Sequence, residues 1–171
     1  AEVVELDLDF APAEPLRLAR ALGRCRALVA RVRPDVIHSH FVSTTLVARL
    51  ALGRRHPVPR LFQVPGPLHL EHPLTRGLYL ATAGPADRWI ASCRWTREEY
   101  LRRGISADRV ALSYYGTAPA ELRVAARGGL RRELGITRDV PLIGMVAWMY
   151  APKRFLGQRR GVKGHEDFLA A

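Results

Sequence analysis

Side chains of the kinds that bind or transform ligands occur in three short stretches of this chain. The stretch VPGPLHLEHP, residues 64–73, carries His69 and Glu71, while HSH at residues 38–40 and KGH at residues 163–165 combine histidines with a lysine and a glycine. A histidine or a carboxylate can orient or deprotonate a hydroxyl group, and a lysine can stabilise an anion. The three stretches therefore suggest substrate binding and acid–base chemistry, but each has a purely structural alternative.

The stretch at residues 64–73 carries the strongest candidate for chemistry. His69 could orient an acceptor hydroxyl or a donor, and Gly66 leaves room for a ligand beside it. The alternative is a loop histidine bonded to the backbone, and the sequence does not decide between the two. Glu71 could contact a ligand, although an acid in the first turn of the following helix is also favoured by the helix dipole, and we prefer that interpretation.

A metal site is a second possibility for the histidines. His38 and His40 are separated by one residue and could chelate an ion, but no third ligand follows at a typical spacing. Cys25 and Cys93 are far apart and show no metal or redox spacing. We therefore predict no metal site and two buried free thiols in a reduced cytoplasm. We expect His38 to be buried at the end of its strand and His40 to face a cleft.

The net charge and the distribution of aromatic residues limit the kinds of binding partner that the chain could have. The net charge of +11 comes almost entirely from arginines that are scattered over the predicted helices. A solvated arginine-rich surface explains this charge, and attraction to phosphorylated substrates, anionic lipid or nucleic acid is the functional alternative. The aromatic–basic interleaving of single-strand binders is missing, so we predict no nucleic-acid partner. Motifs for a nucleophile elbow or a P-loop are also missing.

Short β-type runs alternate with longer helical runs along the first two thirds of the chain. The pattern predicts strands over residues 3–8, 36–38, 60–64, 87–92 and 108–116. It predicts helices over residues 14–33, 43–53, 74–84 and 94–104, the second of them beginning at Ser43 or Thr44. This alternation is typical of an α/β protein with a parallel sheet and helices on both faces. Such sheets bind ligands outside the carboxyl ends of their strands.

The character of the sequence changes after Thr117. Residues 119–139 read as a linker with a connecting helix, and Val140–Tyr150 is an apolar run that predicts a buried strand. The last residues, from Gly161, read as a turn that opens a helix. We therefore predict a first domain over residues 1–118 and the beginning of a second domain over residues 140–171.

Three stretches in this order resemble the glycosyltransferase family 4 enzymes. They are RPDVIHSHFVSTTLVARLAL, DRWIASCRWTREEYLRRGISADRVALSYYGT, and LRRELGITRDVPLIGMVAWMY followed by KGHEDFLAA. Enzymes of this family have the GT-B fold, in which two Rossmann-like domains face each other across a cleft. The resemblance implies most of an acceptor domain that lacks its first strand and glycine-rich loop, followed by the start of a donor-binding domain. It also implies the interior of a longer enzyme, so we expect this piece to be inactive alone.

The resemblance gives Lys163 and Gly164 a function. In the family a lysine at this position pairs with the diphosphate of the donor, where a fixed cation stabilises the charge that grows as the sugar leaves. Gly164 would let the backbone approach and would open a helix whose N-terminus attracts anions. A solvent-exposed lysine on a turn is the structural alternative.

The chain departs from the family pattern at two places. Many members carry a histidine directly at the strand end that corresponds to Pro65, whereas here His69 comes later on the loop. The family's usual phosphate-binding arginine is also replaced. The basic insertion that follows could supply a substitute, and its candidates are Lys153, Arg154, Arg159 and Arg160.

The resemblance implies a glycosyltransferase that moves a sugar, with retention, from a nucleotide-sugar to an acceptor hydroxyl. The acceptor would be a glycan, a lipid-linked molecule or a small molecule, and no cofactor is expected because the nucleotide-sugar is a substrate. We expect a cytoplasmic location, with peripheral contact to the inner face of an anionic membrane as a further expectation. Two alternatives stay open: another GT-B enzyme such as a nucleotide-sugar epimerase, and a non-enzymatic basic binding module.

Overall fold

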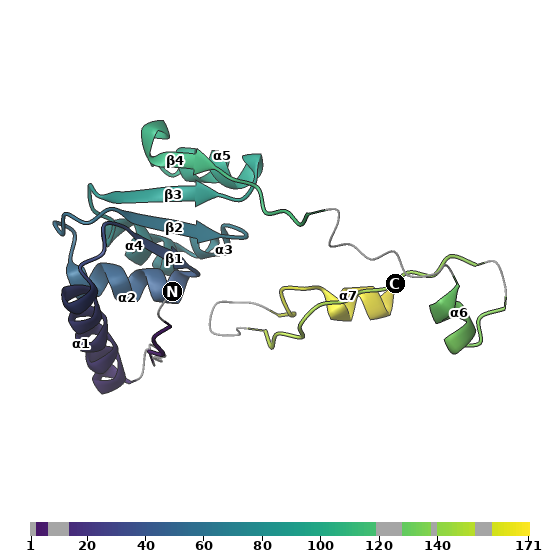
Figure 1. The fold of residues 1–171 in the computed structure, drawn as a ribbon. Helices are drawn as coiled ribbons and strands as arrows, with labels where there is room; N and C mark the ends of the chain where they lie inside the picture. Colours follow the sequence, from purple (N-terminus) through teal and green to yellow (C-terminus); the bar gives the residue numbers. More distant parts are fainter. Residues whose placement is uncertain (1–2, 7–13, 119–127, 138–139, 153–158) are drawn as a thin grey trace. The chain divides into compact units, whose positions relative to one another are not determined.

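The structure is a computed structural model, and it describes residues 3–6, 14–118, 128–137, 140–152 and 159–171. The chain divides into two compact units, Ala1–Gly116 and Thr117–Ala171. Each unit is described by itself below. The first unit contains the sheet and the helices around it, and it therefore carries the candidate site (Figure 1).

Four parallel strands form the sheet of the first unit, in the order β1-β2-β3-β4. They are β1 Ile37–His40, β2 Arg60–Val64, β3 Asp87–Ala91 and β4 Val110–Leu112. Their helices are α1 Pro15–Val32, α2 Val42–Leu52, α3 Leu68–Glu71, α4 Pro73–Ala81 and α5 Arg94–Arg102, with a short 3-10 turn η1 at Ala107–Arg109. The predicted α/β, Rossmann-like parallel sheet with helices around it is confirmed. Helices were predicted on both faces, but the described crossover helices lie on one face, because each strand pairs with the next along the chain.

The crossover helices cover one face of the sheet. Because each strand pairs with the next one along the chain, right-handed crossovers place α2, α4 and α5 on the same side, as Figure 1 shows. The strand side chains on that side are buried, among them Phe62, Val64, Trp89 and Ala91. They form one core with Leu46, Leu70, Tyr79 and Tyr100 from the helices. The side chains of His38 and His40 are exposed on the other face.

The helix α1 packs on α2 rather than on the strands. Ala21 and Cys25 of α1 and Val47, Ala48 and Ala51 of α2 form a second, smaller core. The helix ends where Pro34 disfavours further α conformation, and Arg33 adopts a left-handed conformation with φ 47° there. Its backbone N–H caps the helix by donating to the carbonyl of Val29 over 2.9 Å.

Two sequence-based predictions about the first unit are corrected. The strand predicted over residues 3–8 does not form over residues 3–6, and residues 7 and 8 lie outside the described part of the chain. The helix predicted to begin at Ser43 or Thr44 begins at Val42, and Phe41 occupies the N-cap position without a side-chain cap. The threonine hydroxyls instead bond to backbone carbonyls of the preceding turn, which is a competing choice open to such side chains.

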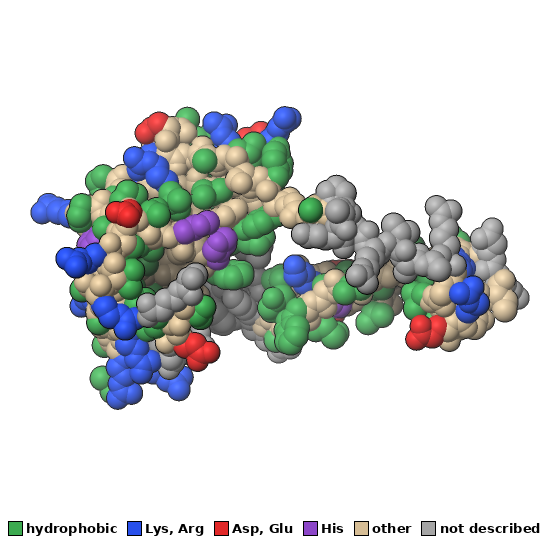
Figure 2. Space-filling model, viewed as in Figure 1, with side chains coloured by type: hydrophobic (Ala, Val, Ile, Leu, Met, Phe, Trp, Pro, Cys, Tyr) green, Lys and Arg blue, Asp and Glu red, His purple; other side chains and the backbone are tan. Residues whose placement is uncertain are grey.

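The second unit contains two short helices, α6 Gly129–Glu133 and α7 His165–Ala170, among its described residues. The strand predicted over Val140–Tyr150 does not form: residues 140–152 contain neither strand nor helix, and the side chains of residues 140–150 are exposed. Figure 2 shows hydrophobic side chains on the surface of this unit. A strand needs a hydrogen-bonded neighbour, and the described residues of the unit supply none.

None of the helices in the described part of the chain is both long and apolar enough to span a bilayer.

Candidate functional site

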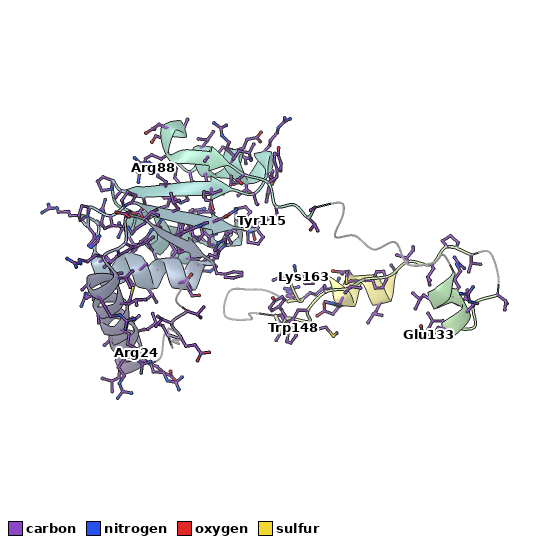
Figure 3. All side chains as sticks on the ribbon, in the orientation of Figure 1. Arg24, Arg88, Tyr115, Glu133, Trp148 and Lys163 are labelled. Carbon is purple, nitrogen blue, oxygen red and sulfur yellow. The ribbon has the colours of Figure 1, made fainter. Side chains whose placement is uncertain are left out.

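The four parallel strands end along one edge of the sheet, and the chain leaves each strand there in a loop. The register pairs His40 with Gln63, and Ala91 with both Val64 and Leu112, so the ends lie side by side. Open parallel sheets bind ligands at such an edge. The loops after β1, β2, β3 and β4 are therefore the candidate site, named the carboxyl edge below. The labelled Tyr115 in Figure 3 lies after β4 at this edge.

Phe41, directly after β1, has a strained backbone. Its φ of 67° and ψ of 157° define a backbone conformation that glycine adopts far more easily than other residues. Its carbonyl accepts hydrogen bonds from the hydroxyls of Thr44 at 3.2 Å and Thr45 at 2.9 Å, and Thr45 also bonds to Ser39 at 2.7 Å. These bonds hold the strained turn, while the Phe41 side chain is 62% exposed.

The loop after β2 is tied to the loop after β3. The buried hydroxyl of Ser92 donates to the carbonyl oxygen of Pro65 over 2.7 Å. Gly66 is half-buried, and a methyl group added at its Cα would meet no atom within 4 Å. The space predicted beside Gly66 is therefore present, and occupation of that space by a ligand stays a prediction.

The structure places His69 inside the core rather than on an open loop. The residue lies in the single turn α3, which the sequence pattern did not predict, and only 5% of its surface is exposed. Its ring meets the rings of Tyr79 at 4.4 Å and Phe62 at 5.4 Å edge-on, and that of Tyr100 at 6.0 Å, measured between centroids. His69 is thus enclosed by aromatic side chains beneath the carboxyl edge.

The electrostatic setting of His69 keeps its imidazole neutral. Burial, and secondly the nearby positive charge of Arg49, lower the pKa of His69 from 6.5 to about 4. Neither ring nitrogen has a hydrogen-bond partner among the described residues, so the backbone-bonded alternative is not what the structure shows. A neutral imidazole of such low basicity can donate one hydrogen bond and accept another near pH 7, but it is a weak general base.

A buried ion cluster under the sheet was not predicted from the sequence. Asp87, at the start of β3, accepts a hydrogen bond from Arg49 over 3.1 Å and from Arg60 over 2.8 Å. All three side chains are almost fully buried. The guanidinium of Arg49 also stacks on the ring of Tyr79 at 4.4 Å and on that of Trp89 at 5.3 Å. The available signal was a charged residue inside the otherwise apolar helix run LVARLAL.

His38, His40 and Glu71 lie at the surface. His40 is exposed at the end of β1, and its ring lies 4.5 Å from that of His38. His38 is exposed rather than buried, because residues two apart in a strand share a face. Glu71 is exposed at the end of α3, ahead of α4, so it does not lie in the first turn of α4. No group of three potential metal ligands occurs among the described residues.

Cys93 differs from the buried thiol that the sequence suggested. Cys25 is buried, whereas Cys93 is only partly covered at the N-cap position of α5, on the carboxyl edge. Its sulfur lies 3.3 Å from the hydroxyl of Thr96. Hydrogen bonds from the Thr96 hydroxyl and backbone lower the pKa of the Cys93 thiol, while burial raises that of Cys25.

The predicted donor-side residues belong to the second unit. Lys163, labelled in Figure 3, is exposed in the turn before α7. Gly164 has a positive φ of 70° at the N-cap, which explains the glycine there. The Glu166 carboxylate accepts a hydrogen bond from the N–H of Gly161 over 3.2 Å. Lys153 and Arg154 lie outside the described residues.

Comparisons with known proteins give the family. A search of curated proteins finds no match. One solved structure, a UDP-N-acetylglucosamine 2-epimerase, matches with 23% identity and a TM-score of 0.45, over 61% of this chain and 29% of its own. The chain thus spans less than a third of that protein. The profile described as Glycosyltransferase Family 4 matches residues 2–121, about the whole first unit, and the chain therefore belongs to glycosyltransferase family 4.

Proposed function

We propose that the protein transfers a sugar, with retention, from a nucleotide-sugar to an acceptor hydroxyl in glycan or glycoconjugate biosynthesis. The observation that carries the proposal is the family match over residues 2–121, together with a carboxyl edge of the kind at which α/β proteins bind ligands. The acceptor is a glycan, a lipid-linked molecule or a small molecule. The site of action is the cytoplasm, with peripheral contact to an anionic membrane.

The carboxyl edge of the first unit takes the acceptor in this proposal. Gly66 has free space beside it, and Phe41 presents an exposed ring after β1. His40 is exposed at the same edge and could hydrogen-bond to a hydroxyl. Glu71 is exposed beside His69 in sequence and is the available carboxylate of this loop.

His69 serves this site best as a positioning residue. Both of its ring nitrogens are buried, so it reaches a substrate only if α3 moves. After such a movement its neutral imidazole could accept or donate one hydrogen bond. A mechanism in which the leaving phosphate takes the acceptor proton needs positioning and charge stabilisation from the protein rather than a strong base.

The second unit binds the donor in this proposal. Lys163 stabilises the negative charge that grows on the diphosphate as the sugar leaves. Gly164, with its positive φ, lets the backbone approach the phosphates. Lys153 and Arg154 remain proposed as further cations for the phosphates.

The test uses the full-length protein as it occurs in its natural source. It is incubated with nucleotide-sugars that carry a label in the sugar and with a panel of acceptors. Transfer predicts acceptor-dependent release of a nucleoside diphosphate and label in the acceptor with retained anomeric configuration. Lys163→Ala should lower kcat by about 10²-fold, whereas Arg132→Ala, an exposed cation in α6, should leave it unchanged.

Three outcomes would count against the proposal. Conversion of the nucleotide-sugar into an isomer without any acceptor would identify a nucleotide-sugar epimerase instead. Salt-dependent binding of phosphate polymers, with no affinity for nucleotide-sugars, would identify a basic binding module. Transfer with inverted configuration would keep the enzyme class and overturn the stereochemistry.

A further inference from the structure

An open surface cavity of about 430 Å³ lies at the end of the first unit opposite the carboxyl edge, and Arg26 and Arg33 on its lining are exposed. It is formed where α1 and α2 end and where the chain enters β2. Its apolar walls are Val29, Ala30, Pro34, Leu52, Pro57 and Val58. A volume in this range suits a small organic ligand. The family assignment and the proposed transfer reaction make no use of this cavity.

Three basic side chains line the same cavity. They are Arg26, Arg33 and His56, and no carboxylate is among its lining residues. Nε of Arg26 donates to the carbonyl of Ala51 over 2.5 Å, which fixes the guanidinium and leaves its terminal nitrogens for another acceptor. Figure 2 shows basic and histidine side chains at the edge from which the strands start.

A purely structural role is the alternative explanation for Arg26 and Arg33: they could stabilise the C-terminal ends of α1 and α2. The C-termini of α1 and α2 carry partial negative charge, about half a unit each, and basic side chains are favoured beside them. Arg26 fits this role because it bonds to the last turn of α2. The Arg33 side chain, which is exposed, makes no hydrogen bond or ion pair among the described residues. The cavity is therefore lined by two guanidinium groups, both of which are exposed.

We propose that this cavity binds an amphipathic anion, with a phosphate or carboxylate on a short hydrocarbon body. The anionic group would lie between Arg26 and Arg33, whose guanidinium groups suit such oxygens. The hydrocarbon would lie against Leu52 and Val58. The site is separate from the carboxyl edge, so it holds whether or not the proposed glycosyl transfer is correct.

The experiment measures binding to the whole chain by isothermal titration calorimetry, with hexyl phosphate as the probe. We expect saturable binding of hexyl phosphate that is at least about tenfold tighter than that of inorganic phosphate, since the six carbons bury apolar surface. Amide NMR shifts should move at Val29, Leu52 and Val58. Equal affinity for the two anions would overturn the amphipathic assignment, and no saturable binding would overturn the site.

Variants locate the anion. Arg33→Met should weaken hexyl phosphate binding by about tenfold or more, and Arg26→Met should do the same. Arg20→Met on the exposed face of α1 is the matched control and should have no effect. A loss in Arg20→Met equal to that in Arg33→Met would show nonspecific charge attraction and contradict the site. Arg26→Met also removes the hydrogen bond to Ala51 and could therefore unfold the protein. In that case the effect of Arg33→Met alone decides whether the site binds the anion.

The source of the ligand is decided by a vesicle assay. Vesicles of phosphatidylcholine with and without phosphatidic acid offer the same phosphate ester chemistry in a membrane. Cosedimentation that depends on phosphatidic acid and on Arg33 would assign the site to a lipid headgroup. Hexyl phosphate binding without cosedimentation would assign it to a soluble metabolite.

Discussion

The hydroxyl of Ser92 donates a hydrogen bond of 2.7 Å to the carbonyl oxygen of Pro65, and this bond joins the loops after β2 and β3. Both residues directly follow their strands, so the bond continues the pairing of β2 with β3 where the backbone ladder ends. It thereby fixes the loop that carries Gly66 relative to the rest of the carboxyl edge. Ser92 is 7% exposed, which shields the bond from competing water.

Removing the Ser92 hydroxyl should loosen this edge. Ser92→Ala is expected to lower the free energy of unfolding by about 0.5–1.5 kcal/mol, the usual net worth of such a bond. Ser92→Thr keeps a hydroxyl and should retain most of the stability. Urea denaturation followed by circular dichroism measures both. A Ser92→Ala protein as stable as the wild type would mean that the bond contributes nothing.

Asp87 should be the most sensitive charged residue of the first unit. Asp87→Asn removes the negative charge that pairs with Arg49 and Arg60 and leaves two arginines buried. Losing one partner of a buried ion cluster costs about 3–5 kcal/mol. The exposed pair of Glu98 and Arg102, separated by 4.0 Å, is the control.

Glu98→Gln should change stability by less than about 1 kcal/mol, because exposed ion pairs are weak. Thermal unfolding monitored by circular dichroism compares the two variants. Similar losses in Asp87→Asn and Glu98→Gln would contradict the special role of the buried cluster.

The fold was largely predictable because its signals are local. Residues 60–64 form a strand as predicted, and residues 87–91 do so within the predicted range 87–92, since short segments rich in apolar and aromatic residues between turns favour strands. The run at Val140–Tyr150 has the same local character but forms no strand, since pairing depends on neighbours that local propensity does not report. The local sequence pattern therefore predicts where a strand can form better than it predicts which strand it pairs with.

The candidate site was less predictable than the fold. His69 was placed on a loop because the prolines of PGPLHLEHP predict turns, whereas the structure forms the single turn α3 and buries the ring. Its aromatic neighbours Phe62, Tyr79 and Tyr100 belong to three other elements, β2, α4 and α5. The pairing of Asp87 with Arg49 likewise joins residues 38 positions apart. Burial and long-range charge pairing of this kind arise only from the tertiary fold.

Cys93 should react with alkylating reagents faster than Cys25. The pKa of Cys93 is lowered by hydrogen bonds from Thr96, and that of Cys25 is raised by burial. Because the thiolate is the reactive form, iodoacetamide at pH 7.5 should label Cys93 first. Peptide mass spectrometry over time measures both rates in one sample. Thr96→Val should slow the labelling of Cys93 and leave Cys25 unchanged, and preferential labelling of Cys25 would refute the assignment.

His69 should make the protein less stable in acid. Its pKa is about 4 in the folded state and near 6.5 when unfolded, so the unfolded state binds more protons between these values. Stability from the neutral ring is therefore fully present above pH 6.5 and is lost as the pH falls towards 4. The difference corresponds to a few kcal/mol at most.

His69→Phe isolates this contribution from that of the acidic side chains. A phenyl ring suits the aromatic surroundings, so the variant should be about as stable as the wild type at pH 7. Between pH 6.5 and 4 the variant should become progressively more stable than the wild type in urea denaturation. Parallel pH profiles for the two proteins would show that the ring does not titrate as described.

Phe41 offers a test that separates backbone strain from side-chain function. Phe41→Gly relieves the positive φ of 67° and should raise the free energy of unfolding by about 1 kcal/mol, whereas Phe41→Ala keeps the strain and should not. Both variants lose the exposed ring that we place at the acceptor site. If the ring contacts the acceptor, both should raise KM for the acceptor to a similar extent, although only one is stabilised. An unchanged KM in both variants would remove Phe41 from the acceptor site and leave its strain as a property of the turn alone.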